Sequence, residues 1–404
     1  MKHMPHVRLW LGLAMSLGTA SLNATVDPAT VWNWEDLSRT PKTWAWQGPF
    51  NGEVRPIWIE GVPFRGRQTR CFAFFGIPAQ ASPSNSVPGI VLVHGGMGTA
   101  YSEWVRQWVQ RGYAAVAVDT CGALPVRGEG VHDWLRSPYG GPSSGTKLTA
   151  IDEPLPDQWV YHAVAAVVRS HSFLRAQPGV AADRIGITGI SWGGVLTCIV
   201  AALDSRLAYA VPVYGCGFNA EAGGLVAGKP ASAKWAALWD PAVYLPFAHC
   251  PMLWVDGTND FAFSLDRVRR SAACAKGEQS FSVYLRMPHG QVEGAAPREI
   301  LAFADHFARG GRALVRITET RCTKDSLSVR FAANGRKVVR AELLWTDDGS
   351  AVAWANRQWP SRVLGNFDPT SGVVSVAWPA NACQAVVNLV TDDGLISSTS
   401  VLSR

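Results

Sequence analysis

The sequence predicts an α/β fold, a three-layer sandwich around a mainly parallel sheet, followed by a small all-β sandwich. Continuous apolar runs such as Gly89–Val93 and Tyr113–Val118 are typical of strands buried on both faces, and helical patterns separate them. Beyond Gly310-Gly311, short strand-like runs follow one another with no helical pattern between them. Because 404 residues allow a large and a small domain, we expect these to be 25–310 and 311–404.

The elements of the large domain follow from their own patterns. An antiparallel hairpin is expected first, because the extended runs Val54–Ile59 and Gln68–Phe75 flank a segment with glycine and proline. The later strands of the sheet are expected at 184–188, 208–213, 251–255 and 281–286. Apolar residues at helical spacing predict helices over 159–168 and 195–203. The connections 124–156 and 216–249 are long enough to be functional loops.

The C-terminal part shows only strand patterns. Its strands are expected at 314–318, 327–331, 338–345, 373–378 and 385–390. No motif in it points to a specific ligand, so rigid packing against the large domain is favoured over glycan binding.

Composition and charge limit the class of protein. With 48% apolar and 17% charged side chains, the chain is globular. A net charge of +6 is small for this length, and no run of Lys and Arg interleaves with aromatic residues, so nucleic acid is not an expected partner. The sequence does not predict an oligomeric state.

The first residues resemble a secretory signal peptide. Lys2 and Arg8 precede the apolar run Leu9–Leu17, and small residues follow as far as Ala24. This run is too short to cross a bilayer, which needs about 20 apolar residues, so stable membrane insertion is not expected. We expect removal of 1–24 and a secreted or periplasmic protein; a buried N-terminal helix is the alternative.

The eight cysteines permit disulfides if the protein is exported. The pairs Cys322–Cys383 and Cys250–Cys274 are our prediction, because each lies within one expected unit, and buried free thiols are the alternative. No CxxC, HExxH or acidic calcium loop occurs, so neither a metal nor a cofactor is expected.

Two segments match Gly-x-Ser-x-Gly, and their contexts differ. Ser191, in Gly189–Gly193, follows a predicted strand and precedes a buried helix, the strand–turn–helix setting of a nucleophile elbow. The glycines suit this turn because a Cβ would collide with neighbouring backbone. Ser143, in Gly141–Gly145, lies among Gly, Pro and Ser with no strand before it. Ser191 is therefore the candidate nucleophile and Ser143 a loop serine.

A serine nucleophile needs a base and an acid, which this setting supplies in the chain order Ser, acid, His. His289 follows the last strand of the sheet, and Asp260 lies in the loop after strand 251–255. Asp256 is the rival acid, less favoured because it lies nearer the strand.

An oxyanion hole needs two N–H donors. The N–H of Trp192 is one candidate, and Gly96 or Met97, in the loop after a predicted strand, supplies the other. We expect His94, which precedes this loop, to be a structural hydrogen-bonding residue.

These motifs resemble the α/β-hydrolase superfamily, and within it the secreted acetyl xylan esterases and dienelactone-hydrolase-like enzymes, which border the prolyl oligopeptidase catalytic domains. The resemblance is carried by His94-Gly95-Gly96, Asp183–Gly194, Gly257–Asp260 and Pro288-His289-Gly290. The chain departs from dienelactone hydrolases proper, whose nucleophile is cysteine, and from prolyl oligopeptidases, because too few residues precede the sheet for a propeller.

The resemblance implies an exported serine carboxylic-ester hydrolase that removes acetyl or feruloyl groups from plant polysaccharide. The tryptophans in or beside the long connections are candidate pocket walls, because indole rings stack on sugars: Trp134, Trp159, Trp235 and Trp239. Two alternatives remain: a serine peptidase of the prolyl oligopeptidase type, and a non-catalytic carbohydrate-binding protein.

Overall fold

A computed structural model describes residues 28–48, 54–128, 133–350, 354–365, 368 and 370–404. The predicted signal peptide, 1–24, lies outside the described residues. Within the described part, no helix combines the length and the apolar character needed to cross a membrane.

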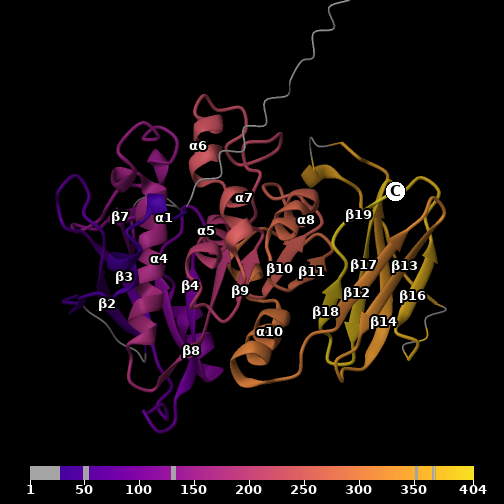
Figure 1. The fold of residues 1–404 in the computed structure, drawn as a ribbon, viewed down its shortest axis with the longest axis horizontal. Helices are drawn as coiled ribbons and strands as arrows, with labels where there is room; N and C mark the ends of the chain where they lie inside the picture. Colours follow the sequence, from indigo (N-terminus) through magenta and orange to yellow (C-terminus); the bar gives the residue numbers. More distant parts are fainter. Residues whose placement is uncertain (1–27, 49–53, 129–132, 351–353, 366–367, 369) are drawn as a thin grey trace, which may run out of the picture.

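The centre of the molecule is a 14-stranded mixed sheet (Figure 1). Six neighbouring strands are parallel, in the order β5 (Ala114–Val118), β4 (Val87–Val93), β8 (Val180–Ile190), β9 (Ala210–Val213), β10 (Met252–Gly257) and β11 (Gln279–Tyr284). The expected hairpin, β2 (Arg55–Glu60) and β3 (Arg70–Gly76), continues the sheet beyond β5 with antiparallel pairing, and β1 (Thr43–Ala45), which was not predicted, pairs with β2. Every residue of β4 and β5 is buried, which confirms strands covered on both faces.

Helices cover both faces of the parallel strands. The described helices are α1 (Pro28–Val31), α2 (Trp34–Ser38), α3 (Ser102–Gln110), α4 (Trp159–Arg175), α5 (Trp192–Leu203), α6 (Ser232–Trp239), α7 (Pro241–Tyr244), α8 (Leu265–Cys274), α9 (Gln291–Ala295) and α10 (Arg298–Arg309). A Cβ at Gly189 of β8 would meet Thr197 of α5, whereas a Cβ at Gly186 would meet Tyr209, whose ring contacts Phe303 of α10. Since residues 186 and 189 point to opposite faces of a strand, α5 and α10 lie on opposite sides of the sheet.

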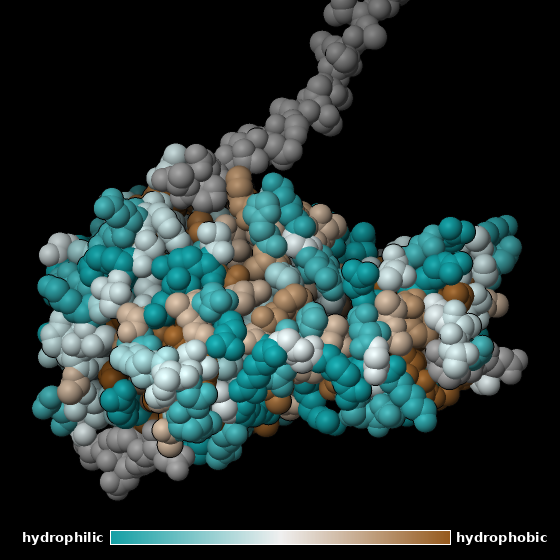
Figure 2. All heavy atoms as spheres, turned by 60° about the horizontal axis from the view of Figure 1, so that its bottom comes forward, coloured by the Kyte–Doolittle hydropathy of each residue, from teal (hydrophilic) through white to brown (hydrophobic). Residues whose placement is uncertain are grey.

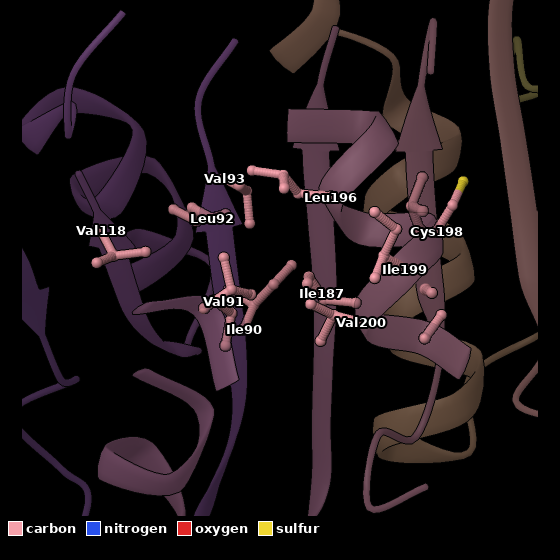
Figure 3. Packing of buried hydrophobic residues seen from close by; sticks show 14 of the residues in the cluster. Ile90, Val91, Leu92, Val93, Val118, Ile187, Leu196, Cys198, Ile199 and Val200 are labelled. Carbon is pink, nitrogen blue, oxygen red and sulfur yellow. The ribbon is translucent and has the colours of Figure 1, made fainter. Parts of the chain in front are cut away.

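The main hydrophobic core lies between the parallel strands and these helices. Figure 3 shows Ile90, Val91 and Leu92 of β4 beside Ile187 of β8, with Ile199 and Val200 of α5 packed near them. All of these residues are fully buried. The predicted three-layer α/β architecture is therefore confirmed.

The C-terminal residues form the expected sandwich of two β-sheets. One sheet consists of β12 (Arg316–Cys322), β13 (Ser326–Ala332) and β16 (Val373–Ala377). The other contains β14 (Val338–Thr346), β15 (Ser361–Val363), β17 (Gln384–Thr391), β18 (Ile396–Ser398) and β19 (Leu402–Ser403). Apolar side chains from both sheets, among them Val329, Phe331, Leu343 and Val387, share one core.

The second of these sheets is continuous with the central sheet, which the sequence did not predict. Strand β18 pairs with β11, where Phe281 lies opposite Ser398. The Ser398 hydroxyl accepts the N–H of Val283 at 2.8 Å, and the Asn388 amide donates to Val283 O at 3.0 Å. In Figure 2 the C-terminal part forms the narrower right-hand side of a face on which hydrophilic and hydrophobic residues are interspersed. The domain boundary at residue 310 stays a prediction.

The long connections contain more regular structure than expected. The first holds the hairpin β6 (Ala123–Arg127) and β7 (Trp134–Arg136), followed by 3₁₀ turns at Ser144–Thr146 and Leu155–Asp157. The second holds α6, α7 and a 3₁₀ turn at Leu245–Phe247.

Both predicted disulfides are wrong, because all eight cysteines are free thiols. Cys322 ends β12 in the three-stranded sheet, whereas Cys383 precedes β17 in the central sheet and donates to Thr346 O at 3.3 Å. Cys250 precedes β10, whereas Cys274 ends α8. The members of each pair thus lie in different layers of the fold.

Candidate active site

The predicted nucleophile lies at a strained turn between a strand and a helix. Ser191 directly follows β8, and α5 begins at Trp192, three residues before the expected start at 195. Its φ of 58° and ψ of −120° are rare for a residue with a side chain and persist only where surrounding structure holds them. The Ser191 N–H donates to Val213 O at 3.0 Å, and its carbonyl accepts the N–H of Val195 at 3.0 Å. These two hydrogen bonds hold the turn at both ends.

Close contacts explain the glycines around this turn. A Cβ at Gly189 would lie 2.1 Å from the carbonyl oxygen of Gly193, and a Cβ at Gly193 would lie 2.1 Å from that of Val93. A Cβ at Gly96 would lie 2.6 Å from Cδ1 of Trp192. Any side chain at these positions would displace the turn or the loop that faces it.

The structure brings Asp260 and His289 together. Nδ1 of His289 lies 2.5 Å from Oδ2 of Asp260. The other carboxylate oxygen, Oδ1, accepts the N–H groups of Ala262 and Phe263, both at 2.8 Å. The ring of Tyr214 stacks on His289 with 4.4 Å between the ring centroids. With Nδ1 donating to the carboxylate, Nε2 is the nitrogen left to act as a base.

The alternative acid, Asp256, forms its hydrogen bond with a backbone N–H group. Its Oδ1 accepts the N–H of Gly257 at 2.7 Å, and its Oδ2 has no hydrogen-bond partner among the described residues. Complete burial, together with the nearby charge of Asp260, raises the pKa of Asp256 well above its ordinary range. A neutral carboxyl group in this position is poorly suited to stabilise an imidazolium.

The candidate oxyanion loop is a tight turn after β4. The N–H of Gly98 donates to Gly95 O at 3.2 Å, and Met97 has a φ of 60° and an exposed side chain. Trp134 of β7 reaches across and donates from Nε1 to Met97 O at 2.8 Å. Trp192 begins α5, and the first N–H groups of a helix lack partners within it. Trp134, predicted as a pocket wall, therefore braces this loop.

His94 has a structural environment, as expected. It is buried, its Nδ1 donates to Gly95 O at 2.7 Å, and its Nε2 accepts the N–H of Thr120 at 3.0 Å. Burial lowers its pKa to about 4, which keeps the imidazole neutral.

Asp119 and Cys121 bring potential metal ligands to within 4.8 Å of His94. Burial raises the pKa of Asp119 to about 7 and that of Cys121 to about 12, so the thiol is protonated at neutral pH. Oδ2 of Asp119 accepts the N–H groups of Cys121 and Ala123, at 3.1 and 2.8 Å. Since both nitrogens of His94 are already hydrogen-bonded, we assign this cluster to holding the loops and not to binding a metal.

A cavity of about 550 Å³ lies beside Ser191 and His289, and both residues line it. This volume is typical of sites that enclose a small organic ligand. Gly96, Met97 and Trp192 also contribute to its walls. The candidate nucleophile, base and oxyanion donors thus share one cavity, while Asp260 lies buried behind His289.

The remaining predicted tryptophan walls have different places. Trp159 lines the cavity and donates from Nε1 to Thr120 O at 2.7 Å. Trp235 is fully buried and packs edge-on against Trp192, outside the described lining. Trp239 is also fully buried, and its Nε1 donates to Gln158. Trp235 and Trp239 therefore lie in the core and not in the cavity wall, because α6 turns its indole rings inward.

Several lining residues were not predicted from the sequence. Phe261, next to Asp260, is 67% exposed and its ring lies 4.7 Å from that of His289. Tyr101 and Lys147 also line the cavity, the latter from the first long connection. Ser143 is exposed and accepts the N–H of Gly145 at 3.3 Å, as expected for a loop serine. The length of that connection was the one sequence signal that could have directed attention to Lys147.

Comparison with known proteins finds one matching family. Residues 61–219 match the model of the acetyl xylan esterase family. This segment is less than half of the chain; it includes Gly96, Met97, Ser191 and Trp192 and ends before Asp260. No curated protein matches the chain.

Solved structures with similar folds have low sequence identity to this chain. The acetyl xylan esterase from Paenibacillus sp. R4 is 18% identical with a TM-score of 0.55, covering 69% of this chain and 93% of its own. Acetyl xylan esterase 1 from Thermoanaerobacterium sp. JW/SL YS485 is 16% identical with a TM-score of 0.49, covering 64% and 88%. The acylaminoacyl peptidase of Pyrococcus horikoshii is 17% identical with a TM-score of 0.47, covering 64% and 43%.

The likeness to the Paenibacillus enzyme is a similarity of fold. The family match covers the segment that contains the strained turn at Ser191. Together they support a hydrolase of the esterase kind. The chain has the α/β-hydrolase fold, and its residues 61–219 are similar to the acetyl xylan esterases.

Proposed function

We propose that this protein is a serine carboxylic-ester hydrolase that removes acetyl or feruloyl groups from plant polysaccharide. The observation that carries the proposal is the shared cavity of Ser191 and His289, with Asp260 hydrogen-bonded to Nδ1 of that histidine. The match of residues 61–219 to acetyl xylan esterases supports the ester as substrate.

The proposed mechanism proceeds through an acyl-enzyme. Oγ of Ser191 attacks the ester carbonyl while Nε2 of His289 takes its proton, and Asp260 stabilises the imidazolium. The N–H of Trp192 and that of Gly96 or Met97 stabilise the oxyanion, and the imidazolium then protonates the departing alcohol. Water, deprotonated by His289, releases the acid and restores the serine.

A polysaccharide substrate is supported by the apolar aromatic walls of the cavity. Trp192 lines it beside Phe261, whose ring is 67% exposed, and exposed aromatic rings pack against the faces of sugars and of feruloyl groups. The volume of about 550 Å³ leaves room for part of the alcohol beside an acetyl group.

The test compares Ser191→Ala with Ser143→Ala, because both serines lie in the same motif and only Ser191 is the proposed nucleophile. We expect Ser191→Ala to lower kcat for 4-nitrophenyl acetate at least about 10³-fold, and Ser143→Ala to leave it unchanged. Acetate release from acetylated xylan should follow the same order. A Ser191→Ala enzyme that stays active would contradict the mechanism.

Two further measurements address substrate class. Chromogenic esters of rising acyl length distinguish acetyl from feruloyl-sized groups by where kcat/KM falls. Aminoacyl 4-nitroanilides test the peptidase alternative, and efficient amide cleavage would replace the esterase proposal.

We also propose export to the periplasm or the medium, on the basis of the N-terminal pattern in 1–24. Sequencing the N-terminus of the mature protein after cell fractionation tests this. A cytoplasmic protein that retains Met1 would exclude it.

A further inference from the structure

One cation lies in the wall of the cavity that holds the proposed nucleophile. Lys147, just after the 3₁₀ turn Ser144–Thr146, lines this cavity together with Ser191. Its Nζ lies 5.3 Å from the centroid of the Trp192 ring and donates to Ser144 O at 3.1 Å. The side chain is therefore held partly buried against the residue that follows the nucleophile.

Among the described residues no carboxylate acts on this ammonium group; the ionisable group beside it is the thiol of Cys121, which is protonated at neutral pH. By contrast, Lys234 on the neighbouring helix α6 is paired with Asp152. A partly buried charge loses hydration, and burial lowers the pKa of Lys147 accordingly. Its one carbonyl acceptor and the Trp192 ring supply partial compensation, and two of its three N–H donors remain available.

An unpaired ammonium group in a substrate cavity favours a ligand that brings the missing negative charge. The aromatic walls would contact the apolar part of such a ligand, while Lys147 would bind its anionic group. Carboxylate is the anion that a plant polysaccharide offers in its acidic sugars, and it can accept hydrogen bonds from an ammonium group at close range.

We propose that Lys147 selects esters whose molecule also carries a carboxylate, such as an acyl group on a sugar chain that contains uronic acid. This inference rests on the proposed esterase function and specifies its substrate class. Lys147 is then a specificity-determining residue that contacts the substrate, and the reaction at Ser191 does not require it.

The test compares matched anionic and neutral esters on wild type and Lys147→Met, which keeps a flexible apolar side chain but removes the charge. One pair, 4-acetoxybenzoate and 4-acetoxybenzamide, places the carboxylate on the alcohol. A second pair, monophenyl succinate and phenyl butyrate, places it on the acyl group. Lys276→Met is the control, because Lys276 is an exposed lysine outside the cavity lining.

We expect Lys147→Met to lower kcat/KM for an anionic ester about tenfold to a hundredfold more than for its neutral partner. The pair that shows the loss identifies the side of the ester that carries the charge. Raising the ionic strength should weaken the preference in wild type, and Lys276→Met should retain it. Equal losses for both members of both pairs would show that Lys147 only supports the loop, and would overturn the proposal.

A binding measurement keeps this test separate from catalysis. Calorimetric titration of Ser191→Ala protein with the same esters should show tighter binding of an anionic ester, and the preference should disappear in the Ser191→Ala/Lys147→Met double variant. If wild type hydrolyses neither kind of ester but this preference is found, the proposed activity fails and the anion site stands. If neutral esters are hydrolysed and no preference is found, the activity stands and the anion site fails.

Discussion

Replacing Asp260 by Asn should remove most of the esterase activity, whereas the same replacement at Asp256 should not. The wild-type carboxylate accepts the N–H groups of Ala262 and Phe263 through Oδ1 and binds His289 through Oδ2. In Asp260→Asn, the amide oxygen can keep both backbone hydrogen bonds, which points the NH₂ group at Nδ1 of His289.

An NH₂ group only donates hydrogen bonds, so Nδ1 must then be unprotonated and the imidazole proton must move to Nε2. In that tautomer His289 cannot accept the proton of Ser191. The loss expected from such a tautomer change is about 10⁴-fold in kcat, or about 5 kcal/mol of transition-state stabilisation. Asp256→Asn preserves the hydrogen bond to the N–H of Gly257 and should keep most of the activity.

Initial rates with 4-nitrophenyl acetate measure both effects, and circular dichroism melting shows whether each variant is folded. Because the two acids lie four residues apart, Asp256 within β10 and Asp260 in the loop that follows it, each variant serves as the control for the other. A folded Asp260→Asn protein that retains about a tenth of wild-type kcat would contradict the tautomer change, and so would a larger loss of activity in Asp256→Asn than in Asp260→Asn.

Three other changes have expected outcomes. Gly193→Ala places a Cβ 2.1 Å from Val93 O, so the free energy of unfolding in urea should fall by about 3 kcal/mol. Asp119→Asn should stabilise the protein, and the gain should grow as pH rises from 4 to 7. Burial raises the pKa of Asp119 in the folded state from 3.8 to about 7. In wild type the unfolded chain therefore loses this proton at a lower pH than the folded protein does, which favours unfolding as pH rises. The effect approaches about 4 kcal/mol at neutral pH. Trp134→Phe removes the hydrogen bond to Met97 O and should lower kcat about fivefold with little change in KM.

Each of these three predictions can be contradicted by a specific result. A Gly193→Ala protein with the urea midpoint of wild type would mean that the turn relaxes without cost. A stability difference between Asp119→Asn and wild type that is the same at pH 4.5 and pH 7 would contradict the raised pKa. An unchanged kcat in Trp134→Phe would show that the oxyanion loop needs no brace from β7.

The sequence predicted those features that short-range chemistry determines. The buried strands, the serine turn and the loop positions of Asp260 and His289 follow from apolar runs, glycine spacing and chain order. The close backbone contacts at Gly189 and Gly193 leave no room for a side chain at either position, which is why the motif can be recognised in the sequence. The walls of the cavity were less predictable, because Trp235 and Trp239 face the core through the packing of α6 on the rest of the chain.

The same limit applies to the disulfides and to the joined sheets. A pairing of Cys322 with Cys383 was inferred from their distance along the chain, but the two residues lie in different sheets of the sandwich. No local pattern in Ile396–Ser398 indicates that this short strand pairs with β11 instead of staying within the C-terminal part. The pairing of β18 with β11 depends on contacts between residues more than a hundred positions apart.

The junction at β11 has a consequence for the edge of the parallel strands. An open edge strand offers unpaired N–H and C=O groups to any other extended chain, which promotes aggregation. The side chains of Ser398 and Asn388 form hydrogen bonds with the N–H and the C=O of Val283 in β11, and β18 pairs with β11 at Phe281. A chain that stops at residue 310 would expose this edge, so the C-terminal strands act as a built-in protective cover for the hydrolase sheet.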